Sequence, residues 1–215
     1  MKVDMRARSA GVLSALGIAA CSQAADIFIE NFGFETDVLA NGAYIIGAPT
    51  GWTSDGGIAG WFNPEVTQFA FEAPEGQNTA FSNGGTLSQV LDVVLTANTS
   101  YTLRIDVGNR FDLSFAPYTV QLWAGGILLA EEFSLIPGFG LFETSVVTYD
   151  ALPGDLKLGL SLEIRFGSES PQVNFDNVQL STTFIPGPAS LAIFALAAVG
   201  VRRRRYRGPG RLHAR

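Results

Sequence analysis

The sequence predicts an all-β fold: an antiparallel two-sheet β-sandwich of the jelly-roll type, flanked by an N-terminal signal helix and a C-terminal transmembrane-like helix. Apolar and polar residues alternate with a period of two along much of residues 26–182, as in half-buried strands. Glycine-containing turn signals separate the alternating segments. Since this stretch shows no helical period, we expect about nine or ten strands within it.

Residues 1–25 have the three parts of a secretory signal peptide. The start is basic, residues 10–20 form an uncharged and mainly apolar run, and small residues follow. This run is too short to span a bilayer stably. We therefore expect a signal peptidase to cut between Ala24 and Ala25.

Cys21 leaves a second processing route open. The segment Ile18-Ala19-Ala20-Cys21 resembles a bacterial lipobox, in which the cysteine becomes the acylated first residue. Cys21 and His213 are the only cysteine and histidine of the chain, and both lie in segments expected to be removed. The mature domain would then lack a thiol nucleophile and an imidazole base, which excludes Ser-His-Asp and Cys-His hydrolases.

The strands are clearest in residues 101–107, 118–122 and 160–166, where every second residue is apolar. Such segments form half-buried antiparallel strands when turns connect them. The turn signals are Asn41-Gly42, Asn83-Gly84-Gly85, Gly125-Gly126, Pro137-Gly138 and Pro153-Gly154.

Several short segments, in order, resemble parts of the galactose-binding-like jelly rolls. Residues 31–35 resemble their opening strand, and residues 173–178 resemble their closing strand. Gly51-Trp52 and residues 74–78 resemble segments between these two strands. The resemblance implies a jelly-roll fold and covers a family that includes carbohydrate-binding modules as well as domains with no known ligand.

The acidic character of the central region bears on its ligands. Between residues 26 and 185 there are 19 acidic and four basic residues, a net charge of −15. Such a domain repels phosphates, so we expect no nucleic acid as a partner. Without cysteine or histidine it can hold a metal only through oxygen atoms, which favours Ca²⁺ or Mg²⁺ over zinc. The alternative is that the charge only keeps the protein in solution.

Glu35 and Asp176 are the candidate ligands of one structural Ca²⁺. The alternation of apolar residues changes parity near Asp176, as a β-bulge would cause, and a bulge frees backbone carbonyls and redirects side chains. The resemblance to the jelly rolls implies that an acid near the opening strand and one in the closing strand share a calcium ion. Alternatively, Glu35 is a surface acid and Asp176 a turn residue.

Trp52, Trp61 and Trp123 are candidates for carbohydrate binding, because exposed tryptophan rings stack on sugar rings. Trp123 points away from the apolar face of its strand, so we expect it to be the most exposed of the three. Core packing is the alternative for each.

The C-terminal residues 185–215 have a tripartite pattern. Pro186, Gly187 and Pro188 precede an apolar segment over residues 189–201. A helix there would be about 20 Å long, shorter than the roughly 30 Å bilayer core. Four arginines follow, which would keep the end in the cytoplasm: Arg202, Arg203, Arg204 and Arg205.

This ending resembles the PEP-CTERM sorting signal, with Gly187 in place of the usual glutamate. The resemblance implies cleavage by an exosortase, an integral membrane cysteine protease, after transient anchoring in the inner membrane. A plain short membrane anchor is the alternative.

We therefore expect a non-catalytic protein of the cell surface or extracellular matrix, exported and associated with exopolysaccharide. The alternative is a carbohydrate-binding module that recognises cell-surface polysaccharide. A glycosidase would need two carboxylates about 5 to 10 Å apart in a cleft, and no pair stands in a recognisable motif.

Overall fold

The computed structural model describes residues 24–186, which contain ten strands and no helix, so the all-β prediction is confirmed. The strands are β1 (Ala25–Ile27), β2 (Tyr44–Ile46), β3 (Thr53–Phe62), β4 (Thr79–Val94), β5 (Thr99–Gly108), β6 (Tyr118–Ala124), β7 (Ile127–Glu132), β8 (Phe142–Ala151), β9 (Ser161–Ser168) and β10 (Val173–Phe184).

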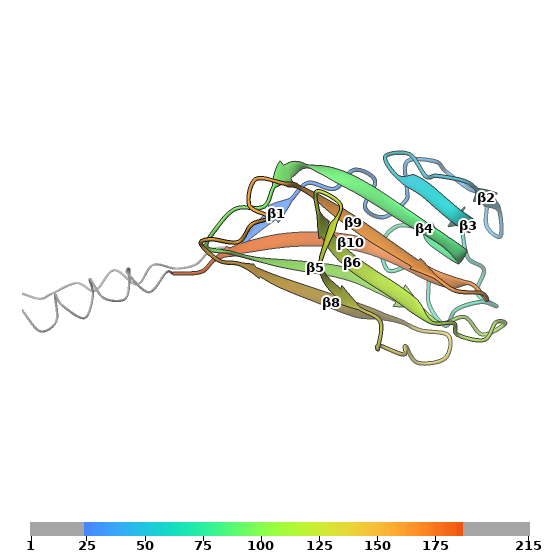
Figure 1. Cartoon of the computed structure of the whole chain (residues 1–215). Coiled ribbons are helices and arrows are strands. Elements are labelled where there is room, and N and C mark those ends of the chain that lie inside the picture. Colours follow the sequence, from blue (N-terminus) through green and yellow to red (C-terminus); the bar gives the residue numbers. More distant parts are fainter. Residues whose placement is uncertain (1–23, 187–215) are drawn as a thin grey trace, which may run out of the picture.

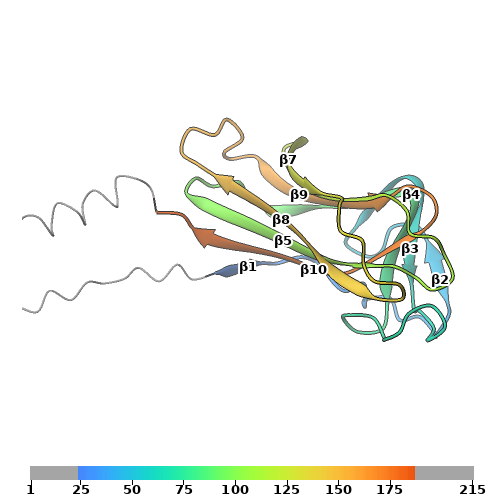
Figure 2. The ribbon, with the colours of Figure 1, turned by 90° about the horizontal axis from the view of Figure 1, so that it is seen from below.

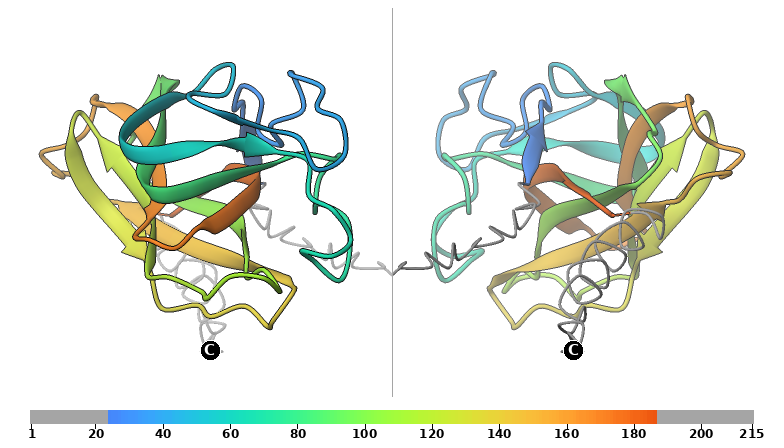
Figure 3. Two further views of the ribbon diagram at one scale, coloured as in Figure 1. Left: turned by 90° about the vertical axis from the view of Figure 1, so that its right-hand side faces the viewer. Right: turned by 90° about the vertical axis from the view of Figure 1, so that its left-hand side faces the viewer.

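All strand pairs are antiparallel and belong to one hydrogen-bonded sheet with the order β7-β6-β9-β4-β10-β5-β8 (Figure 1). β1 pairs with β10, and β2 pairs with β3, which continues to β4. β8 at one end of the order contacts β6 and β7 at the other end. Figure 3 shows the sheet curling round, so that it is nearly closed.

The long strand β4 connects the two layers of the sheet. Along one edge it pairs with β3; along the other, residues 80–82 pair with β10, whereas residues 86–94 pair with β9. The strands β9, β6 and β7 therefore diverge from β10, β5 and β8. The prediction of two separate sheets is corrected in this respect: the layers face each other as in a sandwich, but β4 joins them through continuous hydrogen bonding.

The main core fills the space between these layers. It contains the alternate apolar residues that the sequence pattern had identified on β5, β6 and β9, including Leu103, Leu122 and Phe166, all with no exposed surface. Phe175 of β10 packs against Phe166, with ring centroids 4.8 Å apart. Burying one side of each strand explains the period of two, because successive side chains point to opposite faces.

The segment Asn83-Gly84-Gly85 is not a turn, as the sequence suggested, but lies within β4. The register of β3 and β4 shifts at Ile58, which opposes both Asn83 and Gly84. Gly84 has a φ of +83°, and a Cβ on Gly57 would lie only 2.6 Å from the Gly84 carbonyl carbon. The glycines therefore form a bulge at which two backbones approach closely.

Both ends of the described chain lie at the same end of the molecule, because Ala25 of β1 pairs with Thr182 of β10 (Figure 2). The expected signal helix and transmembrane-like helix fall in residues 1–23 and 187–215, outside the described residues. Within residues 24–186 there is no helix long and apolar enough to cross a membrane.

Candidate functional site

β2 and β3 lie at the end of the molecule opposite the paired ends of β1 and β10 (Figure 1). A cavity of about 330 Å³ is lined by residues of these two strands, of β4 and of loops. We call it the aromatic cavity. Its lining residues come from strands and loops distant in sequence: Gly42, Tyr44, Ile46, Ile58, Phe62, Gln68, Phe81, Asn83, Arg110 and Gln172.

Strand register explains the wall of the aromatic cavity. Tyr44 pairs with Phe62, and Ile58 pairs with Asn83, so these side chains share one face of the β2-β3-β4 layer. Trp61, next to Phe62, points to the opposite face and joins the main core. The bulge at Ile58 changes the register just where β3 and β4 line the cavity.

A second, small core supports this wall. Phe62, Phe69 and Phe81 are buried together, and Phe142 packs against them. The rings of Phe62 and Phe81 meet edge to face with centroids 6.1 Å apart, and those of Phe69 and Phe142 are 4.4 Å apart. Rings packed on several sides keep their positions, so the cavity wall is preformed.

Arg110 carries the main charge in the aromatic cavity. Its Nε and Nη2 donate to the two carboxylate oxygens of Asp112 at 2.7 and 2.6 Å, and its guanidinium carbon lies 5.3 Å from the Phe62 ring centre. The Arg110 side chain is only 10% exposed, against 47% for Asp112. The hydrogen bonds from Arg110 lower the pKa of Asp112, which is therefore ionised at neutral pH.

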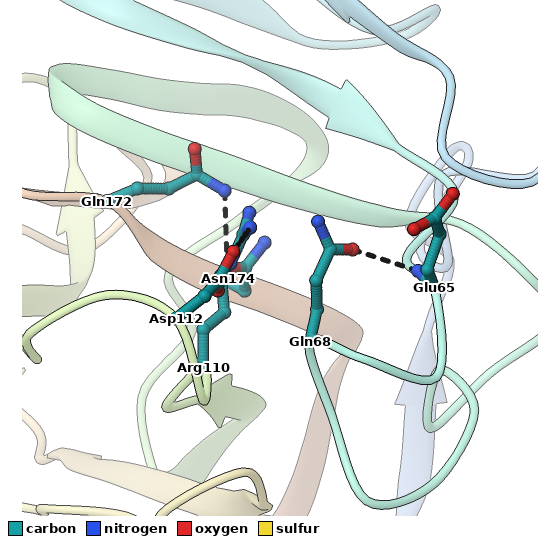
Figure 4. A network of polar contacts seen from close by, with 6 residues as sticks. All are labelled: Glu65, Gln68, Arg110, Asp112, Gln172 and Asn174. Atoms are coloured by element: carbon teal, nitrogen blue, oxygen red, sulfur yellow. Dashed lines mark hydrogen bonds and ion pairs between the residues drawn. The ribbon is translucent and has the colours of Figure 1, made fainter.

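Amide side chains complete the polar part of the site (Figure 4). Gln172 Nε2 donates to Asn174 Oδ1 at 3.4 Å, and buried Asn174 donates to the Ala80 carbonyl at 3.2 Å. Gln68 Oε1 accepts a hydrogen bond from the Glu65 N–H at 2.8 Å. The Gln68 carbonyl accepts from the backbone of the residue after Arg110, which holds the two loops together.

The aromatic cavity is thus equipped to bind a planar apolar group beside a few hydrogen-bonding groups. Asp112 can balance positive charge but, being ionised, cannot act as an acid.

A larger hollow of about 440 Å³ lies beside β1 and is lined mainly by apolar residues. It lacks the convergence of aromatic, amide and guanidinium groups. The sequence reading missed the aromatic cavity, although the run of aromatic residues over 62–81 was a signal available to it.

The predicted calcium ligands Glu35 and Asp176 both bind one turn, residues 75–78. Glu35 Oε1 accepts from the backbone N–H groups of Gln77 and Asn78 at 2.8 and 2.5 Å. Asp176 Oδ2 accepts from the Glu75 N–H at 2.9 Å. The predicted bulge is present, since the pairing of β10 with β5 shifts between Asp176 and Gln179. The fold therefore brings both acids to the same place.

Two carboxyl groups near the turn at residues 75–78 have raised pKa values, unlike carboxyl groups that are free in solvent. Asp176 is fully buried, and burial raises its pKa to about 9. Burial, with the nearby Glu35 carboxylate, also raises the pKa of Glu75. Asn78 Oδ1 is buried without a hydrogen-bond partner. Among the described residues no group of three or more acidic side chains is arranged to hold an ion, so a cation here would need amide or backbone oxygens as well.

The three candidate tryptophans differ in burial. Trp52 and Trp61 are 6% and 7% exposed and belong to the main core, which is the alternative of core packing considered for each of them. Trp123 is half-buried, and the Arg165 guanidinium lies 4.1 Å from its ring centre.

Pro186 is exposed at the end of the described chain, and the other residues assigned to the sorting signal lie beyond it.

Comparison with known proteins gave one family and several similar structures. The model of the HpiC1-like family, described as HpiC1 cyclase, matches residues 25–181. A search of curated proteins found no match.

Two solved structures from Fischerella sp. TAU are similar over most of the described chain. The Stig cyclase Fisc in complex with (3Z)-3-(1-methyl-2-pyrrolidinylidene)-3H-indole is 30% identical, with a TM-score of 0.70 over 76% of this chain and 100% of Fisc. A cyclase in complex with 4-(1H-indol-3-yl)butan-2-one is 31% identical, with a TM-score of 0.68 over 76% of this chain and 100% of that one.

These matches correct the expected identity and role. The identification as a PEP-CTERM protein with a galactose-binding-like domain is overturned, because the matching family is that of the HpiC1-like cyclases. The expectations of a non-catalytic matrix protein and of a carbohydrate-binding module fall with it. So do the expected partners, an exosortase, the inner membrane and exopolysaccharide. The lack of cysteine and histidine in residues 24–186 argues against Ser-His-Asp and Cys-His hydrolases, but not against enzymes that act by binding and orienting a substrate.

Proposed function

The chain belongs to the HpiC1-like cyclase family, and on that premise we propose that it is a cyclase that binds a small indole-like substrate in the aromatic cavity. The observation that carries the proposal is the cavity itself, in which packed aromatic rings meet a small set of polar side chains. Its volume of about 330 Å³ lies within the range of small-molecule sites. The indole ligands of the two Fischerella structures support this class of substrate.

In the proposed reaction the protein acts mainly by orientation. The rings of Phe62 and Tyr44 hold the planar part of the substrate, and the enclosed space folds its side chain back so that the reacting carbons meet. Holding reactants in a productive geometry can contribute up to about 7–11 kcal/mol toward the barrier. Asp112 holds the Arg110 side chain at the cavity through two hydrogen bonds.

The test is a screen of 3-substituted indoles that carry an unsaturated side chain. Ring closure without loss of a group conserves mass, so we expect a product of unchanged mass and altered retention by liquid chromatography with mass spectrometry. Ile58→Trp should abolish it by filling the aromatic cavity, since Ile58 lines it and is 46% exposed. Val90→Trp is the control, because Val90 is an exposed β4 residue that does not line this cavity. Equal turnover by both variants would contradict the location of the site.

We also propose that Glu35 and Asp176 hold one structural Ca²⁺, with the unpartnered Asn78 Oδ1 and backbone carbonyls as further ligands. The donor set fits a cation that prefers oxygen. A bound cation would satisfy the buried Asn78 oxygen and offset the repulsion among Asp176, Glu75 and Glu35. Its contribution is to hold the turn at residues 75–78 against β10, and no catalytic role is assigned to it.

We further propose that the protein is exported and works outside the cytoplasm. The signal-peptide pattern supports this, and so does the position of β1: cleavage after Ala24 would leave the strand intact from its first residue, Ala25. N-terminal sequencing of the exported protein should give Ala25. A lipid-modified Cys21 at the start would instead support the lipobox route.

A further inference from the structure

Two side chains in the aromatic cavity have hydrogen-bond donors that the described residues leave unused. Arg110 engages Asp112 through Nε and Nη2, and its Nη1 has no acceptor in the described part of the chain. Gln68 uses only its amide oxygen, toward Glu65, and its Nε2 is likewise without a partner there. Both residues line the same cavity, and Figure 4 shows the two side chains with their acceptor and donor partners.

The charge around these donors disfavours an anionic ligand. Arg110 is the one charged residue among those that line the aromatic cavity, and Asp112, just outside the lining, neutralises it. The Glu65 carboxylate lies against Gly42 at the cavity rim, where a Cβ on Gly42 would come within 2.5 Å of its Oε1. A carboxylate ligand would therefore meet two acids near the one arginine. A neutral oxygen acceptor meets the donors without that repulsion.

The position of Arg110 is fixed before any ligand arrives. The two hydrogen bonds to Asp112 and the Phe62 ring below the guanidinium restrain the side chain, which is 10% exposed. Hydrogen bonds to charged groups in partly buried sites are worth about 1.5–3 kcal/mol. That range corresponds to roughly a tenfold to hundredfold difference in affinity.

We propose that Arg110 Nη1 and Gln68 Nε2 donate to a carbonyl-type oxygen of the ligand, so that the substrate class is a neutral aromatic compound bearing such an oxygen. This inference rests on the proposed function of the aromatic cavity as an indole site. It assigns Arg110 and Gln68 to substrate selection, and Asp112 to positioning Arg110 and excluding anions.

Isothermal titration calorimetry with three probes tests the assignment: 4-(1H-indol-3-yl)butan-2-one, 3-butylindole and 4-(1H-indol-3-yl)butanoate. The wild-type protein should bind the ketone at least about tenfold more tightly than 3-butylindole, which lacks the oxygen, and more tightly than the carboxylate. Equal affinity for the ketone and 3-butylindole would overturn the inference while leaving the indole site intact. Failure of every indole probe to bind would contradict the proposed function itself.

Variants separate the role of Arg110 from a general effect on folding. Arg110→Met should bring the ketone and 3-butylindole to nearly equal affinity. Arg165→Met is the matched control, since Arg165 also pairs with an acid two residues away and stacks on an aromatic ring, but lines no part of the cavity. It should keep the wild-type preference. If Arg110→Met also keeps it, the inference is wrong.

Asp112→Asn provides a second test that leaves Arg110 in place. Asp112 is about half exposed, so the substitution should be tolerated by the fold. Removing its charge should increase the affinity for the carboxylate probe at least about tenfold relative to the ketone. An unchanged ratio of the two affinities would contradict the assigned role of Asp112.

Discussion

Single residues show how environment decides chemistry in this protein. Asp112 and Asp176 are both aspartates, but the first is half exposed beside Arg110 and has a lowered pKa. The second is fully buried, and its pKa is raised to about 9. Arg110 and Arg165 make similar ion pairs and stack on aromatic rings, yet only Arg110 lines the aromatic cavity. The residue type alone thus does not identify the site.

The raised pKa of Asp176 predicts how stability depends on pH when no divalent cation is bound. Between the pKa of the unfolded chain, about 3.9, and the folded value of about 9, the native state binds more protons than the unfolded state. The free energy of unfolding should therefore fall as pH rises through this window, by up to about 1.4 kcal/mol per pH unit. Urea unfolding with chelator at pH 5, 6, 7 and 8 measures this, and Asp176→Asn should reduce the slope. A slope unchanged in the variant would assign the effect to another group.

Tyr44 is the residue through which the cavity wall can be tested with little effect on folding. It lines the aromatic cavity but is 65% exposed. Tyr44→Ala should weaken binding of 4-(1H-indol-3-yl)butan-2-one about two- to tenfold, as expected for loss of one aromatic contact. The free energy of unfolding should change by less than about 1 kcal/mol. Phe133→Ala, at a residue of similar exposure away from the cavities, should leave binding unchanged.

At the scale of elements, the β3–β4 bulge and the strand register form the site. β4 carries Phe81 and Asn83 to the aromatic cavity on one face, while Ala80 faces the main core. On β3, Phe62 lines the aromatic cavity, while Trp61 on the opposite face belongs to the main core. Two hydrophobic clusters therefore lie on opposite faces of one layer, which is why the usual alternation of buried and exposed residues is lost over the end of β3.

The bulge gives a prediction about Gly57. A Cβ at this position would lie 2.6 Å from the backbone carbonyl carbon of Gly84, so Gly57→Ala must displace a strand. We expect a loss of about 1–3 kcal/mol in the free energy of unfolding, together with weaker indole binding, because Ile58 and Asn83 move with the backbone. Chemical denaturation and calorimetry measure the two effects. Gly138→Ala is the control, since its nearest neighbour is the end of the Leu141 side chain. Similar losses in both variants would argue against a special role for the bulge.

The whole molecule places its candidate site and its chain ends at opposite ends of the sheet. β1 and the end of β10 pair at one end, and β2 and β3, whose residues line the aromatic cavity, lie at the other (Figure 1). The proposed calcium site lies between segments that are far apart in sequence: the loop after β1, the turn before β4 and the bulge of β10. A cation there would stabilise the contacts among these three segments.

Calcium should therefore raise the stability of the whole domain. At a free concentration one hundred times its dissociation constant, a single site adds about 2.7 kcal/mol. Melting temperatures measured with Ca²⁺ and with chelator should differ for the wild type, and Asp176→Asn should remove the difference. Asp92→Asn, at an exposed acid of β4, is the control and should retain it. Equal melting temperatures of the wild type in both conditions would contradict the site.

The sequence by itself determined the all-β class, the buried face of the central strands and the irregularity near Asp176. These follow from local rules, because a strand turns successive side chains to opposite faces and a bulge changes that parity. It also identified Glu35 and Asp176 as a pair, through the resemblance of the opening and closing strands. It did not identify the segment at Gly84 as part of a strand, because the same glycines serve turns and bulges.

Only the tertiary structure decided where a small molecule can bind. Arg110, Gln68 and Phe62 meet because loops and strands from separate parts of the chain pack together, and no local pattern encodes that convergence. The buried state of Trp52 and Trp61, the joining of the two layers by β4 and the contact of Asp176 with Glu75, 101 residues earlier, were decided in the same way. Alternation specifies which side of a strand is apolar, whereas a cavity depends on which distant surfaces the closed sheet brings together.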